Sequence, residues 1–128
     1  MDLGIKGKTA VVSGSTAGIG FAIAAALAAE GAQVVINGRT EARVNSAKEQ
    51  IAKRVVGAQL RGVAADLGTL AGIETFQKKI PEADILVNNL GIFEPKPFLE
   101  IPDADWLRFF EVNVLSGVRL SRTIFRAC

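Results

Sequence analysis

The chain has 128 residues, of which 49% are hydrophobic and 22% charged, with a formal net charge of +2 at pH 7. This composition fits one globular domain, excludes a disordered chain, and gives no support for a nucleic-acid or membrane partner. Histidine is absent, which excludes triads, general bases and metal ligands built on it, and we expect no metal site. Cys128 is the single cysteine, so no disulfide forms within the chain, and we expect a cytoplasmic protein.

Short apolar runs alternate with amphipathic helical patterns along the whole chain. In chain order, the predicted elements are a strand at 9–13, a helix through Ile19, Ile23 and Leu27, a strand at 33–37, a helix through Val44, Ala47, Ile51 and Val55, a strand at 59–64, a helix through Leu70, Ile73, Phe76 and Ile80, a strand at 83–88, and a long helix from Asp103 through Trp106, Phe109, Phe110, Val114 and Leu120 toward Phe125.

The ends of these elements carry matching signals. Gly31 is typical of a residue that ends a helix, and Thr40 is a suitable cap for the next one. Strands that alternate with helices predict an α/β protein, in which helices cover both faces of a parallel sheet. Right-handed crossovers then favour a Rossmann-type doubly wound sheet, a three-layer αβα arrangement of strand order 3-2-1-4, within one domain over residues 1–128.

A glycine-rich turn connects the first predicted strand to the first predicted helix. Gly14, Gly18 and Gly20 let backbone N–H groups approach a pyrophosphate at the N-terminus of that helix. A tight turn that only packs helix against strand is the alternative. The strand before the turn and the helix after it favour nucleotide binding.

The spacing G-x-x-x-G-x-G resembles the short-chain dehydrogenase/reductase family, with Ser13 where the family usually has threonine. Further marks are Asn88-Asn89-Leu90-Gly91 after the fourth strand, in which Leu90 replaces the usual alanine, Asp66-Leu67 after the third strand, and Asn113 in the last helix. These marks cover the whole chain in the family's order. The resemblance implies a set of cofactor-binding residues: Gly14, Gly18, Ile19, Gly20, Asp66, Leu67, Asn89 and Gly91. We also expect Ser15 and Thr16 to add hydroxyl contacts to the cofactor.

Each of these marks also has a structural interpretation. Asn88 and Asn89 suit the end of a strand, and Asp66 suits the N-cap of a helix. Asn113 is unusual in the middle of a helix, because its side chain competes for backbone hydrogen bonds. A solvent-facing position is the alternative, whereas the resemblance places Asn113 in the family's catalytic set.

Arg39 bears on the choice of cofactor. Turns that prefer NAD place an acid at the end of the second strand, on the ribose 2′-hydroxyl, and here the strand continues into Gly38 and Arg39. A guanidinium group can hold a 2′-phosphate. We therefore expect NADP(H), with NAD(H) as the alternative cofactor and a surface arginine as the alternative role.

The resemblance also implies a reaction, the transfer of hydride between a nicotinamide and a small alcohol or carbonyl substrate. The family's tyrosine acid/base, its lysine four residues later and its serine lie beyond residue 128, and the chain contains no tyrosine. We expect this chain to be the N-terminal half of such an oxidoreductase, inactive alone and part of a homo-oligomer. A complete, non-catalytic nucleotide-binding or interaction module is the alternative, and Arg39 disfavours a methyltransferase. Phe93, Glu94 and Phe98 are expected near the substrate.

Overall fold

The structure is a computed structural model that describes residues 2–125, so Cys128 lies outside the described part. Its elements, in chain order, are β1 (Thr9–Val12), α1 (Gly18–Ala29), β2 (Gln33–Gly38), α2 (Glu41–Arg54), β3 (Gln59–Ala64), α3 (Leu70–Lys79), β4 (Ile85–Val87), the 3-10 turn η1 (Phe98–Glu100), α4 (Asp103–Phe110), the π-helical turn η2 (Glu111–Leu115) and α5 (Ser116–Ile124).

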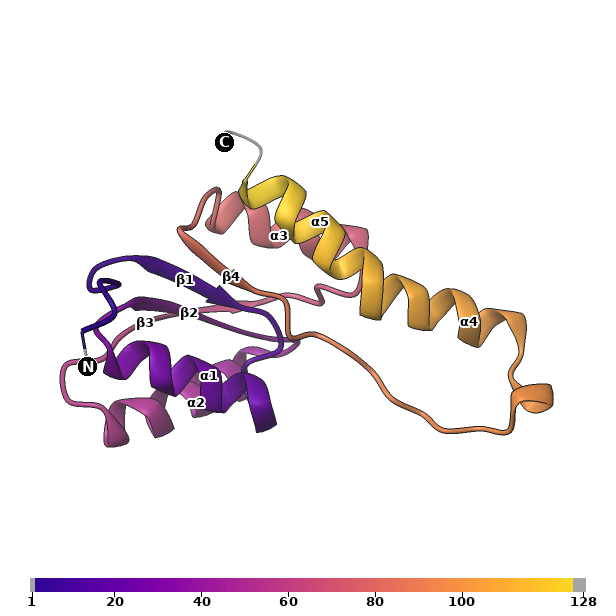
Figure 1. The fold of residues 1–128 in the computed structure, drawn as a ribbon, viewed down its shortest axis with the longest axis horizontal. Coiled ribbons are helices and arrows are strands. Elements are labelled where there is room, and N and C mark those ends of the chain that lie inside the picture. Colours follow the sequence, from indigo (N-terminus) through magenta and orange to yellow (C-terminus); the bar gives the residue numbers. More distant parts are fainter. Residues whose placement is uncertain (1, 126–128) are drawn as a thin grey trace.

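The four strands form one parallel sheet of order β3-β2-β1-β4. In its register, Val11 on β1 lies between Val35 on β2 and Leu86 on β4. Helices α1 and α2 cover one face, and α3 and α5 cover the other (Figure 1). The predicted Rossmann-type sheet is therefore confirmed, including its strand order.

Two apolar cores lie on opposite sides of the sheet because successive strand residues point to opposite faces. On β2, Val34 and Ile36 join the core beneath α1 and α2, whereas Val35 joins the core beneath α3 and α5. All three are almost completely buried. Burial on both faces explains why these strands read as continuous apolar runs.

The buried face of α1 differs from the predicted one. The expected stripe began at Ile19, but this side chain is 75% exposed, and Gly20, Ala24 and Ala28 face the sheet instead. A Cβ at Gly20 would lie 2.4 Å from the amide nitrogen of Asn89. Close approach of the helix to the strands therefore selects the small residues, and the larger apolar ones are left at the side.

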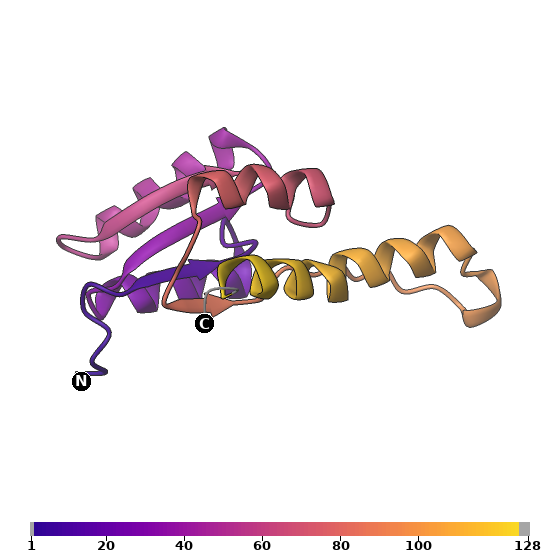
Figure 2. The ribbon, with the colours of Figure 1, turned by 90° about the horizontal axis from the view of Figure 1, so that it is seen from above.

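The last predicted helix is one continuous rod made of α4, η2 and α5. Its α5 end packs beside α3, with Leu120 and Ile124 buried, while its α4 end extends beyond the sheet (Figure 2). The π turn between them is a departure from the predicted uniform helix. Within residues 2–125, no helix is both long and apolar enough to cross a lipid bilayer.

Candidate functional site

Helix α1 begins beside the carboxyl end of β1 with no side chain capping it. Its N-cap is Ala17, which offers no acceptor to the first backbone N–H groups. By contrast, Thr40 accepts a hydrogen bond from the N–H of Arg43 at the start of α2, and Thr69 accepts one from Gly72 at the start of α3. The start of α1 thus keeps its N–H groups and its positive dipole end available for an anion.

The glycines of the turn before α1 are needed for different physical reasons. Gly14 and Gly18 have φ angles of +60° and +61°, in the left-handed region that other residues rarely adopt. Gly20 has no room for a side chain, because a Cβ there would lie 2.5 Å from the carbonyl oxygen of Gly14. The turn can therefore bring its backbone close to a ligand.

Ser13 and Asn89 tie this turn to the segment that follows β4. The Ser13 hydroxyl accepts hydrogen bonds from the N–H groups of Asn89 and Leu90, each 3.0 Å long. The Asn89 amide donates to the carbonyl oxygens of Ser13 and Gly14, at 3.2 and 3.1 Å. Leu90 packs over Gly14, since a Cβ on that glycine would be 3.3 Å from its Cδ1. Sequence analysis named these residues as separate family marks, and the structure joins them directly.

Asn37 is a buried polar residue whose importance the sequence analysis missed. Its side-chain oxygen accepts from the N–H of Gly14, and its amide nitrogen donates to the carbonyls of Val63 and Ala65. Its own N–H donates to the hydroxyl of Ser15. Asn37 therefore joins the carboxyl ends of three strands, and a lone asparagine closing an apolar strand was the signal for it.

The expected hydroxyl contacts divide between Ser15 and Thr16. Ser15 is completely buried, and its hydroxyl oxygen accepts the hydrogen bond from Asn37, so it supports the turn from within. Thr16 is half-buried against Gly38, where a Cβ would be 2.4 Å from the threonine methyl group. An acidic side chain at position 38 would therefore require Thr16 to move.

A shallow hollow of about 480 Å³ opens between the glycine turn and the start of α2, lined by Thr16, Ala17, Ala42, Arg43 and Ser46. Arg39 is exposed at the end of β2 and is not part of this lining. Arg43 brings a second guanidinium to the same region, from the first turn of α2. Sequence analysis missed Arg43, because its place in the first turn of the helix gave no signal of a ligand.

Asp66 and Leu67 follow β3 and have different environments. Asp66 is exposed, and its carboxylate accepts from the N–H of Gly68 at 3.0 Å, while Thr69 is the residue that caps α3. The alternative that Asp66 is the N-cap is therefore wrong. Leu67 is buried in the core beneath α3 and α5, so its side chain holds this segment in place.

Asn113 lies in the π turn and pairs with the backbone that follows β4. Its amide oxygen accepts from the N–H of Ile92 at 2.7 Å, and its amide nitrogen donates to the carbonyl of Ile92 at 3.1 Å. Gly91 is adjacent, since a Cβ there would lie 3.3 Å from the same amide oxygen. Asn88 instead donates to the Ser121 hydroxyl on α5. The asparagines thus anchor the segment after β4 to three different elements.

A parallel doubly wound sheet with an uncapped, glycine-lined helix start at its carboxyl edge defines a Rossmann-fold nucleotide-binding protein. The chain matches the short chain dehydrogenase family over residues 8–128, and it belongs to that family. The resemblance inferred from the sequence is therefore confirmed, and the methyltransferase interpretation is set aside.

Relatives with names and structures support the same assignment. The chain is 55% identical to the uncharacterized oxidoreductase YvaG of Bacillus subtilis (strain 168), over 95% of this chain and 46% of that protein. It is 37% identical to the 3-oxoacyl-[acyl-carrier-protein] reductase FabG of Escherichia coli (strain K12), over 98% of this chain and 51% of that protein.

Among solved structures, L-sorbose reductase from Gluconobacter frateurii, complexed with NADPH and L-sorbose, superimposes with a TM-score of 0.90. It is 36% identical, and the match covers 98% of this chain and 49% of that one. A metagenomic short-chain oxidoreductase in complex with NADP gives a TM-score of 0.84 at 30% identity, covering 96% of this chain and 57% of that one. The chain thus spans about half the length of the relatives it matches.

Proposed function

We propose that the whole protein is an NADP(H)-dependent oxidoreductase that interconverts a small alcohol and its carbonyl compound, and that this chain supplies its cofactor-binding half. The observation that carries the proposal is the uncapped start of α1 behind a turn of glycines, beside capped starts of α2 and α3. Loss of a capping side chain costs about 1 kcal/mol, so an uncapped start at this position is consistent with an anionic ligand.

The residues present fit a dinucleotide. Gly14, Gly18, Ile19 and Gly20 would hold the pyrophosphate with backbone N–H groups and cover it with the exposed Ile19 side chain. Asp66 would face the adenine, and the backbone between Asn89 and Gly91 would lie along the nicotinamide half. Ser15 and Leu67 support these segments from the interior. When bound, the nicotinamide ring supplies or accepts the hydride of the reaction.

A preference for NADP(H) over NAD(H) rests on the end of β2. The acid that would bind a ribose 2′-hydroxyl is absent at Gly38, and Thr16 occupies the space of its Cβ. Arg39 is exposed at this point, and Arg43 lines the hollow beside Thr16. Two guanidinium groups would give a 2′-phosphate charge-assisted hydrogen bonds.

The chemistry of the proposed reaction needs groups that this chain does not contain. Family membership implies a tyrosine acid/base with a lysine and a serine, and the chain has no tyrosine. We therefore expect the 128 residues alone to be inactive. Of the family's catalytic set, this chain contributes Asn113, whose side chain is held by two hydrogen bonds to the backbone of Ile92.

Binding of NADPH to the whole protein tests the proposal, with cofactor fluorescence as the readout. Gly20→Ala places a methyl group against Gly14 and Asn89 and should weaken NADPH binding at least about tenfold, since roughly 1.4 kcal/mol of distortion suffices. Ala26→Ser adds one atom on the exposed side of the same helix and is the matched control. Unchanged affinity in Gly20→Ala would rule out this site.

A further inference from the structure

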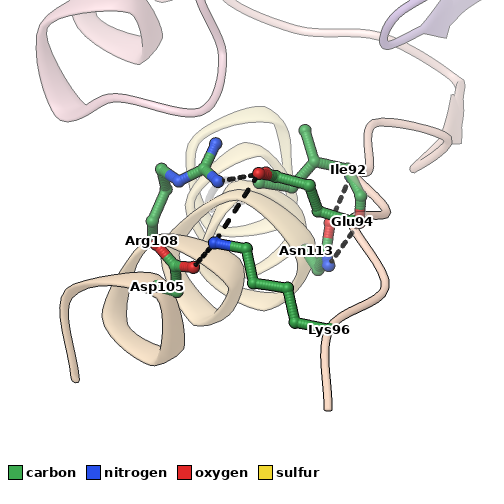
Figure 3. A network of polar contacts seen from close by, with 6 residues as sticks. All are labelled: Ile92, Glu94, Lys96, Asp105, Arg108 and Asn113. Carbon is green, nitrogen blue, oxygen red and sulfur yellow. Dashed lines mark hydrogen bonds and ion pairs between the residues drawn. The ribbon is translucent and has the colours of Figure 1, made fainter. Parts of the chain in front are cut away.

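A second set of contacts lies beyond the segment Asn89–Gly91 and involves charged residues that the proposed function does not use. The segment 92–96 runs along the rod in the direction opposite to the helix (Figure 3). Ile92 pairs with Asn113, Glu94 with Arg108, and Lys96 with Asp105, the last at 2.5 Å. Lys96 also lies 3.9 Å from Glu94, which links the two ion pairs.

The contacts come from alternate residues of the segment, as they do along an extended chain. Four residues of extended chain span roughly 13 Å, at about 3.3 Å each. On the rod, the eight steps from residue 105 to residue 113 span roughly 12 Å, at about 1.5 Å each. The two spacings match, so each alternate residue of the segment meets a partner without stretching.

The π turn completes this match. In a regular α-helix, position 113 would lie about 140° around the axis from position 108, because each residue turns about 100°. The π turn spans Glu111–Leu115 and widens the helix between these positions. It brings Asn113 back toward the face that carries Asp105 and Arg108, where it meets Ile92.

The two ends of the segment after β4 are therefore held separately. Asn89 and Leu90 are fixed by Ser13 on the β1 turn, which is the proposed cofactor side. Residues 94 and 96 are fixed by charges on α4. Phe93 lies between the anchored positions and is 89% exposed.

We propose that Glu94 and Lys96, through Arg108 and Asp105, are positioning residues that hold the segment 92–96 on α4 as one wall of the substrate site. The inference rests on the proposed function. Ligands of doubly wound sheets bind beyond the carboxyl ends of the strands, and the segment 92–96 follows the carboxyl end of β4. In this inference, the ion pairs serve substrate recognition, whereas the hydrogen bonds of Ser13 to Asn89 and Leu90 serve cofactor binding.

The first test measures the segment directly and needs no activity. Hydrogen–deuterium exchange of the whole protein reports the Ile92 amide in peptides that cover residues 92–96. Glu94→Gln and Lys96→Gln should each raise its exchange about two- to fivefold, the range for losing an exposed ion pair. Wild-type protein at 1 M NaCl should behave similarly, because the screening length there is only about 3 Å.

Matched variants separate positioning from general damage. Glu111→Gln removes the 3.0 Å ion pair to Arg119 on the same rod and should leave the exchange of segment 92–96 unchanged. Exchanging the two charges, in the double variant Glu94→Arg with Arg108→Glu, should restore the wild-type exchange. Exchange that stays at the wild-type rate in Glu94→Gln and Lys96→Gln would overturn the inference, whatever the activity.

The second test uses turnover of short ketones and aldehydes with NADPH. Glu94→Gln should raise KM for the carbonyl compound about two- to fivefold, with the Kd for NADPH unchanged. Faster exchange with an unchanged KM would contradict the role in substrate recognition. If the wild-type protein did not bind NADPH, the proposed function would be contradicted instead. The exchange experiment would still test whether the ion pairs hold the segment 92–96 on α4.

Discussion

Replacing Arg39 with alanine is the sharpest way to examine the choice of cofactor. In the proposed complex, the Arg39 guanidinium contacts the 2′-phosphate, a group that NADH lacks. A hydrogen bond to a charged group contributes about 1.5–3 kcal/mol, which corresponds to about a 10- to 150-fold loss of NADPH affinity in Arg39→Ala. NADH affinity should change less than about twofold, because no part of NADH reaches this side chain.

The assay is a fluorescence titration of the whole protein with each cofactor, at fixed ionic strength because the phosphate contact is screened by salt. Arg122→Ala removes an exposed arginine from α5, on the other face of the sheet, and should alter neither affinity. Arg43→Ala shows whether the second guanidinium shares the phosphate. Equal losses of NADPH and NADH in Arg39→Ala would refute the reasoning, because the residue would then not be sensing the 2′-phosphate.

Four other outcomes are expected. Asn113→Leu removes both hydrogen bonds to Ile92 and should lower kcat while the Kd for NADPH holds, as measured by steady-state kinetics and titration. Asn37→Ala leaves buried backbone groups without partners and should lower the free energy of unfolding by about 2–4 kcal/mol in urea denaturation. The hydrogen bond to Asp105 holds the pKa of Lys96 above its ordinary value of 10.5, so Lys96 stays charged at pH 10.5 and loses the ion pair only as the pH rises through the raised pKa. In an NMR titration, the Lys96 midpoint should be lower in Asp105→Asn than in the wild-type protein. The isolated 128 residues should self-associate in sedimentation experiments, since β4 is an edge strand and Trp106, Leu107 and Phe110 are exposed.

The sheet was predictable because its signals are local. Strands β1 and β2 are buried on both faces and read as apolar runs, and the more exposed β3 at Gln59–Ala64 has the predicted bounds. The glycine turn was also recognisable, since positive φ at Gly14 and Gly18 limits the residue type directly. In these segments, backbone geometry and burial leave little choice of side chain.

Other features depend on which elements meet in space. The buried face of α1 is set by the close approach of Gly20 to Asn89, which no helical pattern encodes. The roles of Asn37 and Arg43 come from strands and helices that are distant in sequence. The π turn at Asn113 is coupled to Ile92 on another segment, so a periodic pattern within the helix predicts a uniform rod instead.

The rod made of α4, η2 and α5 divides into two parts of unequal local stability. In α5, Ser116, Leu120 and Ile124 are buried against the domain, whereas no residue of α4 is buried. Because α4 buries no residue of its own, its stability depends on α5, with which it forms one continuous helix, and on its contacts with the segment 92–96. Backbone amides of α4 should therefore open in local fluctuations far smaller than global unfolding, while those of α5 open only with the sheet. A ligand or neighbouring chain that covers α4 would also order it, and the free energy needed for this ordering would lower the net affinity. Binding and local folding are therefore thermodynamically coupled at this end of the rod.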